Sequence, residues 1–107
     1  MDHLENINQD ISYLINENIS YEFVEDCYII LNSNNGEYYE LNNSSSFIWD
    51  LVSKKSSIRE IIEHTKKHFS LPDEKVSEIL SALDKFEHLE LIKKIENWKE
   101  LKIFLKI

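Results

Sequence analysis

An Asn-Gly step between two runs of strand-forming residues is the feature that most constrains the fold of this chain. Asn35 and Gly36 separate the apolar run 27–31 from the run 37–41, and Gly36 is the single glycine of the sequence. Both residues tolerate positive φ, as a tight hairpin turn requires. The step therefore predicts an antiparallel hairpin whose second strand covers residues 37–41.

The two-residue period of a strand assigns the side chains of that second strand to two faces. Tyr39 and Leu41 are expected on the core face, and Tyr38 and Glu40 on the wetter face. Ahead of the hairpin, Tyr21 and Phe23 have the aromatic character of a further strand, and the short connection 25–26 joins it to the run 27–31. Three antiparallel strands follow from this pattern.

Apolar stripes at helical spacing predict three helices after the hairpin. Polar residues 42–46 offer N-caps for the first helix, and Ser56 or Ser57 offers one for the second. Ser70 is a plausible cap for the third helix, with Pro72 in its first turn. The order of elements predicts an α+β, winged-helix-like domain, in which a three-stranded antiparallel sheet is followed by three helices.

The expected domain covers residues 20–95, with residues 91–95 as a candidate short strand. Residues 1–19 are read as an acidic, weakly specified extension, although residues 1–18 carry apolar residues at roughly helical spacing. Residues 96–107 form a basic, apolar tail whose pattern suits an amphipathic helix or a strand. That choice stays open, and so does the possibility that the tail packs on the domain or on a second copy in a homodimer.

Charge and composition exclude several classes of protein. The formal net charge is −8, from 20 acidic and 12 basic residues, so nucleic acid and anionic membranes are poor partners. No apolar run approaches the roughly 20 residues that a membrane-spanning helix needs. Cys27 is the single cysteine, so no internal disulfide is possible. A chain of this kind without an apolar leader is expected in the cytoplasm.

No catalytic, metal or cofactor site is predicted. His64 and His68 share one helix face, but two ligands without a third at recognisable spacing do not make a zinc site. Cys27 lies in an apolar strand and suits a buried structural thiol. A single glycine argues against a phosphate-binding loop, and residues 44–46 fit a capping role.

Several short motifs follow one another in a fixed order. They are Ile-Leu-Asn at 30–32, Gly-Glu-Tyr-Tyr-Glu-Leu-Asn at 36–42, Phe-Ile-Trp-Asp-Leu at 47–51, and the later runs 58–62, 76–83 and 89–92. Together they resemble the PqqD-like family of precursor-recognition domains in the biosynthesis of ribosomally made, post-translationally modified peptides. Their order and spacing extend over about residues 20–95. The acidic start and the basic tail depart from the family pattern.

The resemblance implies an accessory protein without enzymatic activity or cofactor. It would bind the leader segment of a precursor peptide and present the rest to a separate modifying enzyme. The leader would add a strand beside residues 37–41 and pack on the third helix. The candidate contacts are Glu37, Tyr38, Tyr39, Glu40, Leu41, Lys75, Val76, Ile79, Leu83 and Phe86. Leu41 and Leu83 fit the core at least as well, which leaves Tyr38 as the most testable side chain, and Lys75 fits a solvated surface.

The order of elements also permits a winged-helix DNA-binding regulator. Its reading helix should be basic. The third predicted helix instead holds five carboxylates against Lys75 and Lys85, so contacts with phosphate would be opposed electrostatically.

Overall fold

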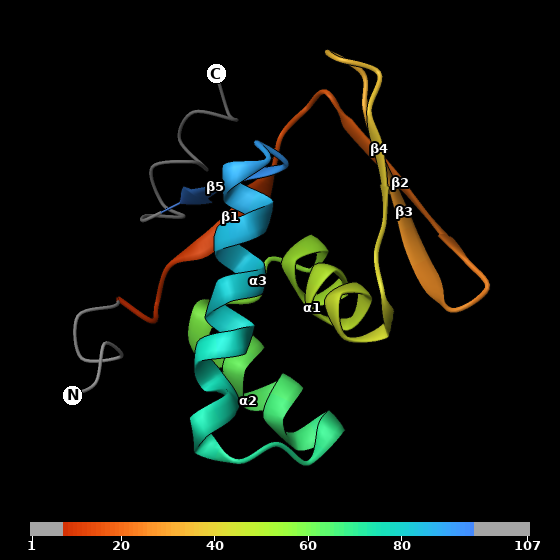
Figure 1. Ribbon diagram of the computed structural model, residues 1–107. Coiled ribbons are helices and arrows are strands. Elements are labelled where there is room, and N and C mark those ends of the chain that lie inside the picture. Colours follow the sequence, from red (N-terminus) through yellow and green to blue (C-terminus); the bar gives the residue numbers. More distant parts are fainter. Residues whose placement is uncertain (1–7, 96–107) are drawn as a thin grey trace.

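The computed structural model describes residues 8–95, so residues 1–7 and the predicted tail 96–107 lie outside the described part. The strands form a three-stranded and a two-stranded sheet. Figure 1 shows the larger sheet on one side of the helices and the smaller sheet on the other side. The elements are β1 Ser12–Ile15, β2 Ile19–Val24, β3 Cys27–Asn32, β4 Tyr38–Glu40, α1 Asn43–Ser53, α2 Ile58–Phe69, a 3-10 turn Asp73–Lys75, α3 Val76–His88 and β5 Ile92–Ile95. The predicted fold class and the short strand within 91–95 are confirmed.

The three-stranded sheet has the order β2-β3-β4 and is antiparallel throughout. Gly36 has a φ of +76° in the β3–β4 connection, whereas Asn35 keeps a negative φ. The side-chain oxygen of Asn35 instead accepts a bond from the Glu37 amide at 2.9 Å. At the other end of the sheet, Glu25 and Asp26 both adopt positive φ in the tight β2–β3 turn. Both turns lie where the sequence predicts them.

Residues 12–15 lie in the segment that the sequence suggests is a weakly specified extension, and they form strand β1. Ser12–Ile15 pairs antiparallel with β5, so that Ser12 lies opposite Ile95 and Ile15 opposite Ile92. Ile11 and Tyr13 are buried in the core, and the Ile58 amide donates to the Ile11 carbonyl at 2.8 Å. The apolar spacing of this segment suits a helix, but pairing with a strand about eighty residues away decides its conformation.

Polar residues fix where the helices begin. The side chain of Asn42 caps α1. Ser57 caps α2, and Glu60 completes a capping box by accepting a bond from the Ser57 amide. The sequence suggested Ser70 as the N-cap of the third helix, but Ser70 does not cap that helix. It closes the C-terminus of α2 in the left-handed conformation, and Pro72 precedes the 3-10 turn that leads into α3.

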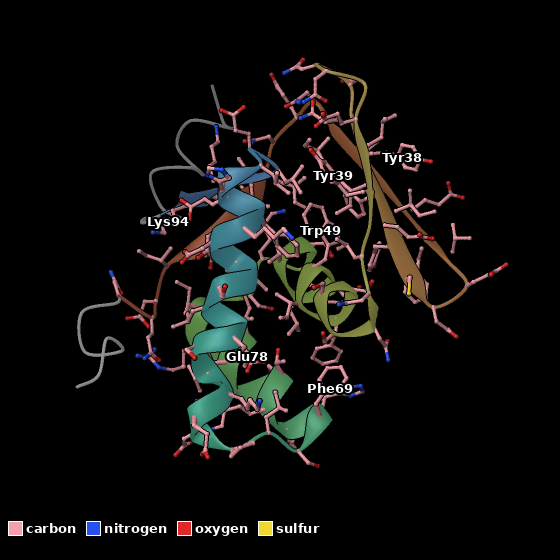
Figure 2. All side chains as sticks on the ribbon, in the orientation of Figure 1. Tyr38, Tyr39, Trp49, Phe69, Glu78 and Lys94 are labelled. Carbon is pink, nitrogen blue, oxygen red and sulfur yellow. The ribbon has the colours of Figure 1, made fainter. Side chains whose placement is uncertain are left out.

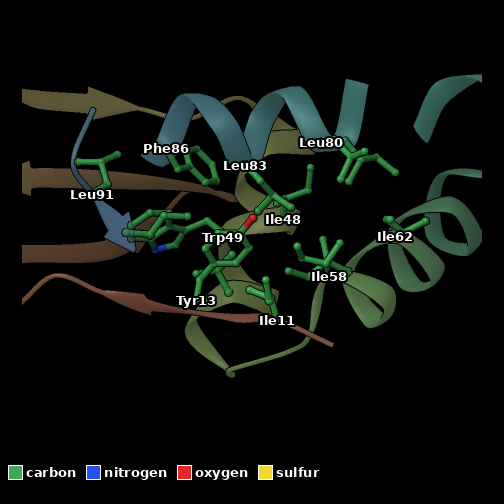
Figure 3. Packing of buried hydrophobic residues seen from close by; sticks show 14 of the residues in the cluster. Ile11, Tyr13, Ile48, Trp49, Ile58, Ile62, Leu80, Leu83, Phe86 and Leu91 are labelled. Atoms are coloured by element: carbon green, nitrogen blue, oxygen red, sulfur yellow. The ribbon is translucent and has the colours of Figure 1, made fainter. Parts of the chain in front are cut away.

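The core is formed where α1 lies between α3 and the sheet (Figure 1). Trp49 on α1 is fully buried and packs edge-to-face against Phe86 of α3 and Tyr21 of β2, with ring centroids 5.2 and 5.6 Å apart. Figure 3 shows Trp49 among Tyr13, Leu83 and Leu91. This packing holds the three-stranded sheet and α3 on opposite sides of α1. Among the described residues, no helix is long and apolar enough to cross a membrane.

Candidate functional site

One edge of β4 is free of a neighbouring strand within the described residues. The pairs Leu41–Tyr28 and Glu37–Asn32 are hydrogen-bonded pairs, because the Leu41 amide donates to the Tyr28 carbonyl and the Asn32 amide to the Glu37 carbonyl, both at 2.9 Å. Hydrogen bonding alternates along an antiparallel strand. The backbone N–H and C=O groups of Tyr38 and Glu40 therefore point away from β3, toward the free edge.

The side chains of β4 divide between two faces, as the sequence predicts. The Tyr38 side chain is 70% exposed, whereas Tyr39 and Leu41 are half-buried against the core. Figure 2 shows Tyr39 on the side of Trp49 and Tyr38 on the side away from the helices. The Tyr39 hydroxyl donates to Glu37 Oε1 at 2.8 Å, and this bond, together with partial burial and the Glu37 charge, raises the pKa of Tyr39.

The candidate residues on α3 are mostly core residues. Val76, Ile79, Leu83 and Phe86 are each 5% exposed or less. Lys75 is exposed, and its Nζ lies 3.1 Å from Glu78 Oε2. The part that these side chains play in peptide binding remains a prediction, because burial alone does not decide it. Ile79 and Lys75 do border a cavity.

A pocket of about 400 Å³ lies between the first half of α3, the start of α1 and the end of α2. We call it the groove pocket. It begins just beyond the point where β4 ends, since Asn42 and the first turn of α1 follow that strand directly. Of the predicted residues only Lys75 and Ile79 line it. The others that line it are Ser44, Ser45, Ile48, Thr65, Phe69, Leu71, Glu78 and Ala82.

Thr65 is the polar group of this pocket that sequence reasoning missed. Its side chain is 1% exposed, and its hydroxyl has no hydrogen-bond partner among the described residues. A buried hydroxyl usually finds a partner. Because Thr65 lines the groove pocket, a ligand in the pocket can supply that partner. The helical spacing of Thr65 marked it only as a core position.

The histidines and the cysteine singled out in the sequence do not form a metal site or a fully buried thiol in the described part of the chain. His64 and His68 are both exposed, and no group of three or more metal-ligating side chains occurs within residues 8–95. Cys27 is half-buried, so the expectation of a buried thiol is only partly met.

The family model of coenzyme PQQ synthesis protein D (PqqD) matches residues 27–92. The chain belongs to the PqqD family. The matched region of this PqqD family member contains β3, β4 and all three helices, and therefore both the free edge and the groove pocket. Strands β1 and β2 precede it. A comparison with curated proteins finds no match.

A solved structure described as TbiB1 in complex with the TbiA(beta) leader peptide has a similar fold. The TM-score is 0.70 at 21% sequence identity, over 74% of this chain and 93% of TbiB1. At that identity the likeness shows a shared fold. The protein with the similar fold, TbiB1, is in complex with a leader peptide in that structure.

Proposed function

We propose that this PqqD family member is a non-catalytic accessory protein. It binds the leader segment of a ribosomally made precursor peptide by strand addition at β4 and presents the rest to a separate modifying enzyme. The outward backbone groups of Tyr38 and Glu40, next to the groove pocket, carry the proposal. The family and the leader-peptide complex of TbiB1 support it. Neither comparison supports the alternative of a DNA-binding regulator.

Affinity and specificity come from different groups in this arrangement. The free edge of β4 offers the N–H and C=O of two residues, and bonds to them hold any extended chain regardless of its sequence. The sheet is antiparallel throughout, so an antiparallel leader continues its pattern. Specificity comes from side chains that enter the groove pocket, where burial of one Leu or Phe side chain contributes about 1.5–3 kcal/mol.

The experiment that tests strand addition begins with a peptide. Random 20-residue peptides are displayed and selected on the immobilised full chain, and a selected peptide is measured by calorimetry. The decisive variant is Glu40→Pro. It removes an amide that points to the free edge, while the ladder bonds of Tyr39 and Leu41 to β3 remain. We expect at least a tenfold loss of affinity.

Glu40→Ala is the matched control, because it removes the same side chain and keeps the amide. Glu40 is exposed, so both variants should keep the fold. Amide exchange of β3 in the Pro variant checks that the ladder is intact. If Glu40→Pro and Glu40→Ala bind the peptide equally well, the peptide does not pair with β4 and the proposed mode of binding is wrong.

A further inference from the structure

A second pocket, of about 300 Å³, lies under the tip of the β2–β3 hairpin and has no part in strand addition. We call it the aromatic pocket. Its walls include four aromatic rings, those of Phe23, Tyr28, Phe47 and Phe69, together with the carboxylates of Asp26 and Asp50. Its volume is at the low end for ligand sites and suits one long side chain.

The Phe23 side of the aromatic pocket is open to solvent, whereas Tyr28, Phe47 and Phe69 are half-buried. Phe23 is 57% exposed although it lies on the face of the sheet that packs against the helices, because the hairpin tip extends beyond α1 (Figure 1). Its ring lies against Tyr28 on β3, with centroids 4.9 Å apart. Phe47 and Phe69 form the opposite wall, with centroids 5.4 Å apart. Aromatic ring faces of this kind attract cations.

The charges of the pocket are negative and incompletely paired. Asp26 makes no ion pair within residues 8–95. Asp50 accepts a bond from the Tyr28 hydroxyl at 2.7 Å, and its second oxygen lies 2.9 Å from the Nζ of Lys54. The Lys54 side chain is 66% exposed, so that surface pair holds Asp50 weakly.

No Lys or Arg is among the described residues that line the pocket. His68 is its one basic side chain, and the imidazole is stacked on Phe47 with centroids 4.2 Å apart. The start of α1 and the end of α2 meet here, and the partial charges of these two helix ends oppose each other. The carboxylates of Asp26 and Asp50 therefore make the electrostatic potential of the pocket negative.

The two pockets are neighbours around the first turn of α1. Phe69 lines both, and Ser44 and Ser45 border the groove pocket while Asn43 and Ser46 border the aromatic pocket. A peptide that pairs antiparallel with β4 has its N-terminal side at the end of β4 that leads into α1. Residues just upstream of the pairing segment therefore lie beside this turn.

We propose that the aromatic pocket binds an arginine side chain of the precursor peptide, located a few residues N-terminal to the segment that pairs with β4. This inference rests on the proposed function. Arginine fits better than lysine, because its planar guanidinium stacks on aromatic rings and bonds a carboxylate through two N–H groups. The pocket thus adds a second point of recognition that the free strand edge alone does not provide.

The first test uses a probe that needs no precursor peptide. N-acetyl-arginine amide is titrated into the full chain, and amide shifts are followed by NMR, with the lysine analogue and the neutral citrulline analogue as comparisons. We expect shifts at Phe47 and Asp50 for arginine, smaller ones for lysine and none for citrulline. Equal shifts for arginine and citrulline, or none for arginine at the pocket, would overturn the cation site.

The second test locates the arginine on the peptide. The peptide selected for strand addition is extended by an arginine through linkers of two to five Gly-Ser residues, at its N-terminus or at its C-terminus. One N-terminal extension should bind about fivefold more tightly, which corresponds to about 1 kcal/mol at 1.4 kcal/mol per tenfold change. The C-terminal extensions should give no gain.

Two variants assign that gain to the pocket. Asp26→Asn removes a charge at a position whose φ of +72° asparagine tolerates, and Phe23→Leu removes an exposed ring. Both should abolish the fivefold gain and leave binding of the unextended peptide unchanged. If the unextended peptide binds and no N-terminal arginine improves it, the inference is wrong while strand addition stands. If no peptide binds at all, strand addition fails, and the arginine probe still decides the chemistry of the pocket.

Discussion

Replacement of Thr65 by valine tests whether the groove pocket is built for a ligand at the expense of stability. The Thr65 hydroxyl is buried and lacks a partner within the described structure. An unsatisfied buried polar group costs about 1–3 kcal/mol. Valine puts a methyl group in its place with the same branched shape. We therefore expect Thr65→Val to raise the free energy of unfolding by about 1 kcal/mol, and the melting temperature by about 4–8 °C.

The same substitution should weaken peptide binding. If a polar atom of the peptide pairs with the hydroxyl, its loss costs about 0.5–1.5 kcal/mol, or roughly two- to twelvefold in affinity. Urea unfolding and calorimetry with the selected peptide measure the two effects on one sample. Thr65→Ser is the matched control: it keeps the hydroxyl and loses one methyl group, so stability should fall by about 1 kcal/mol while binding is retained.

Two results would contradict this reasoning. A fall in stability for Thr65→Val would mean that the hydroxyl already has a partner in the free protein. A gain in stability with unchanged affinity would mean that the bound peptide does not reach Thr65.

Three further substitutions or deletions test the fold around the site. Ser57→Ala removes one half of the capping box of α2 and should cost about 1 kcal/mol in urea unfolding, whereas Ser56→Ala should cost less. In the folded chain burial alone would raise the pKa of Asp50. The hydrogen bonds from Lys54 and Tyr28 outweigh burial and hold this pKa below 3.8. Tyr28→Phe should therefore raise the pKa of Asp50 in a carboxyl NMR titration. Its stability deficit should be full above pH 3.8 and shrink as the pH falls through the folded-state pKa. Deletion of residues 1–15 removes β1 with the buried Ile11 and Tyr13 and should lower the melting temperature far more than deletion of residues 1–7.

Local signals in the sequence determine most of the architecture. The Asn-Gly step predicts the β3–β4 hairpin, although only Gly36 adopts the positive φ that a tight turn would require of both residues. The cap candidates at 42–46 and at Ser56 or Ser57, with the apolar stripes behind them, predict where α1 and α2 begin. In the structure the caps are Asn42 and Ser57. The same pattern favours a free edge on β4, because this strand lies between a hairpin and a helix, and no described strand pairs with that edge.

Features that depend on distant residues were not predictable in this way. Ser12–Ile15 is a strand because β5 pairs with it, and nothing in its own spacing reveals that partner. Thr65 has the position of a core residue in its helix, and the lack of a partner for its hydroxyl depends on α1 and α3. Ser70 is of a residue type that often caps the start of a helix, but it adopts the left-handed conformation that ends α2.

The length of β4 explains why a free edge need not bind peptides indiscriminately. β4 has three residues, of which Tyr38 and Glu40 turn one N–H and one C=O each toward the edge, so a pairing strand gains at most four backbone bonds. At about 0.5–1.5 kcal/mol each, these bonds contribute about 2–6 kcal/mol, against about 4–15 kcal/mol for the lost freedom of the two molecules. Backbone pairing alone therefore falls short of a stable complex. Side chains that fill the groove pocket have to make up the difference, so the edge sets the direction of the peptide and the pocket beside α3 selects it.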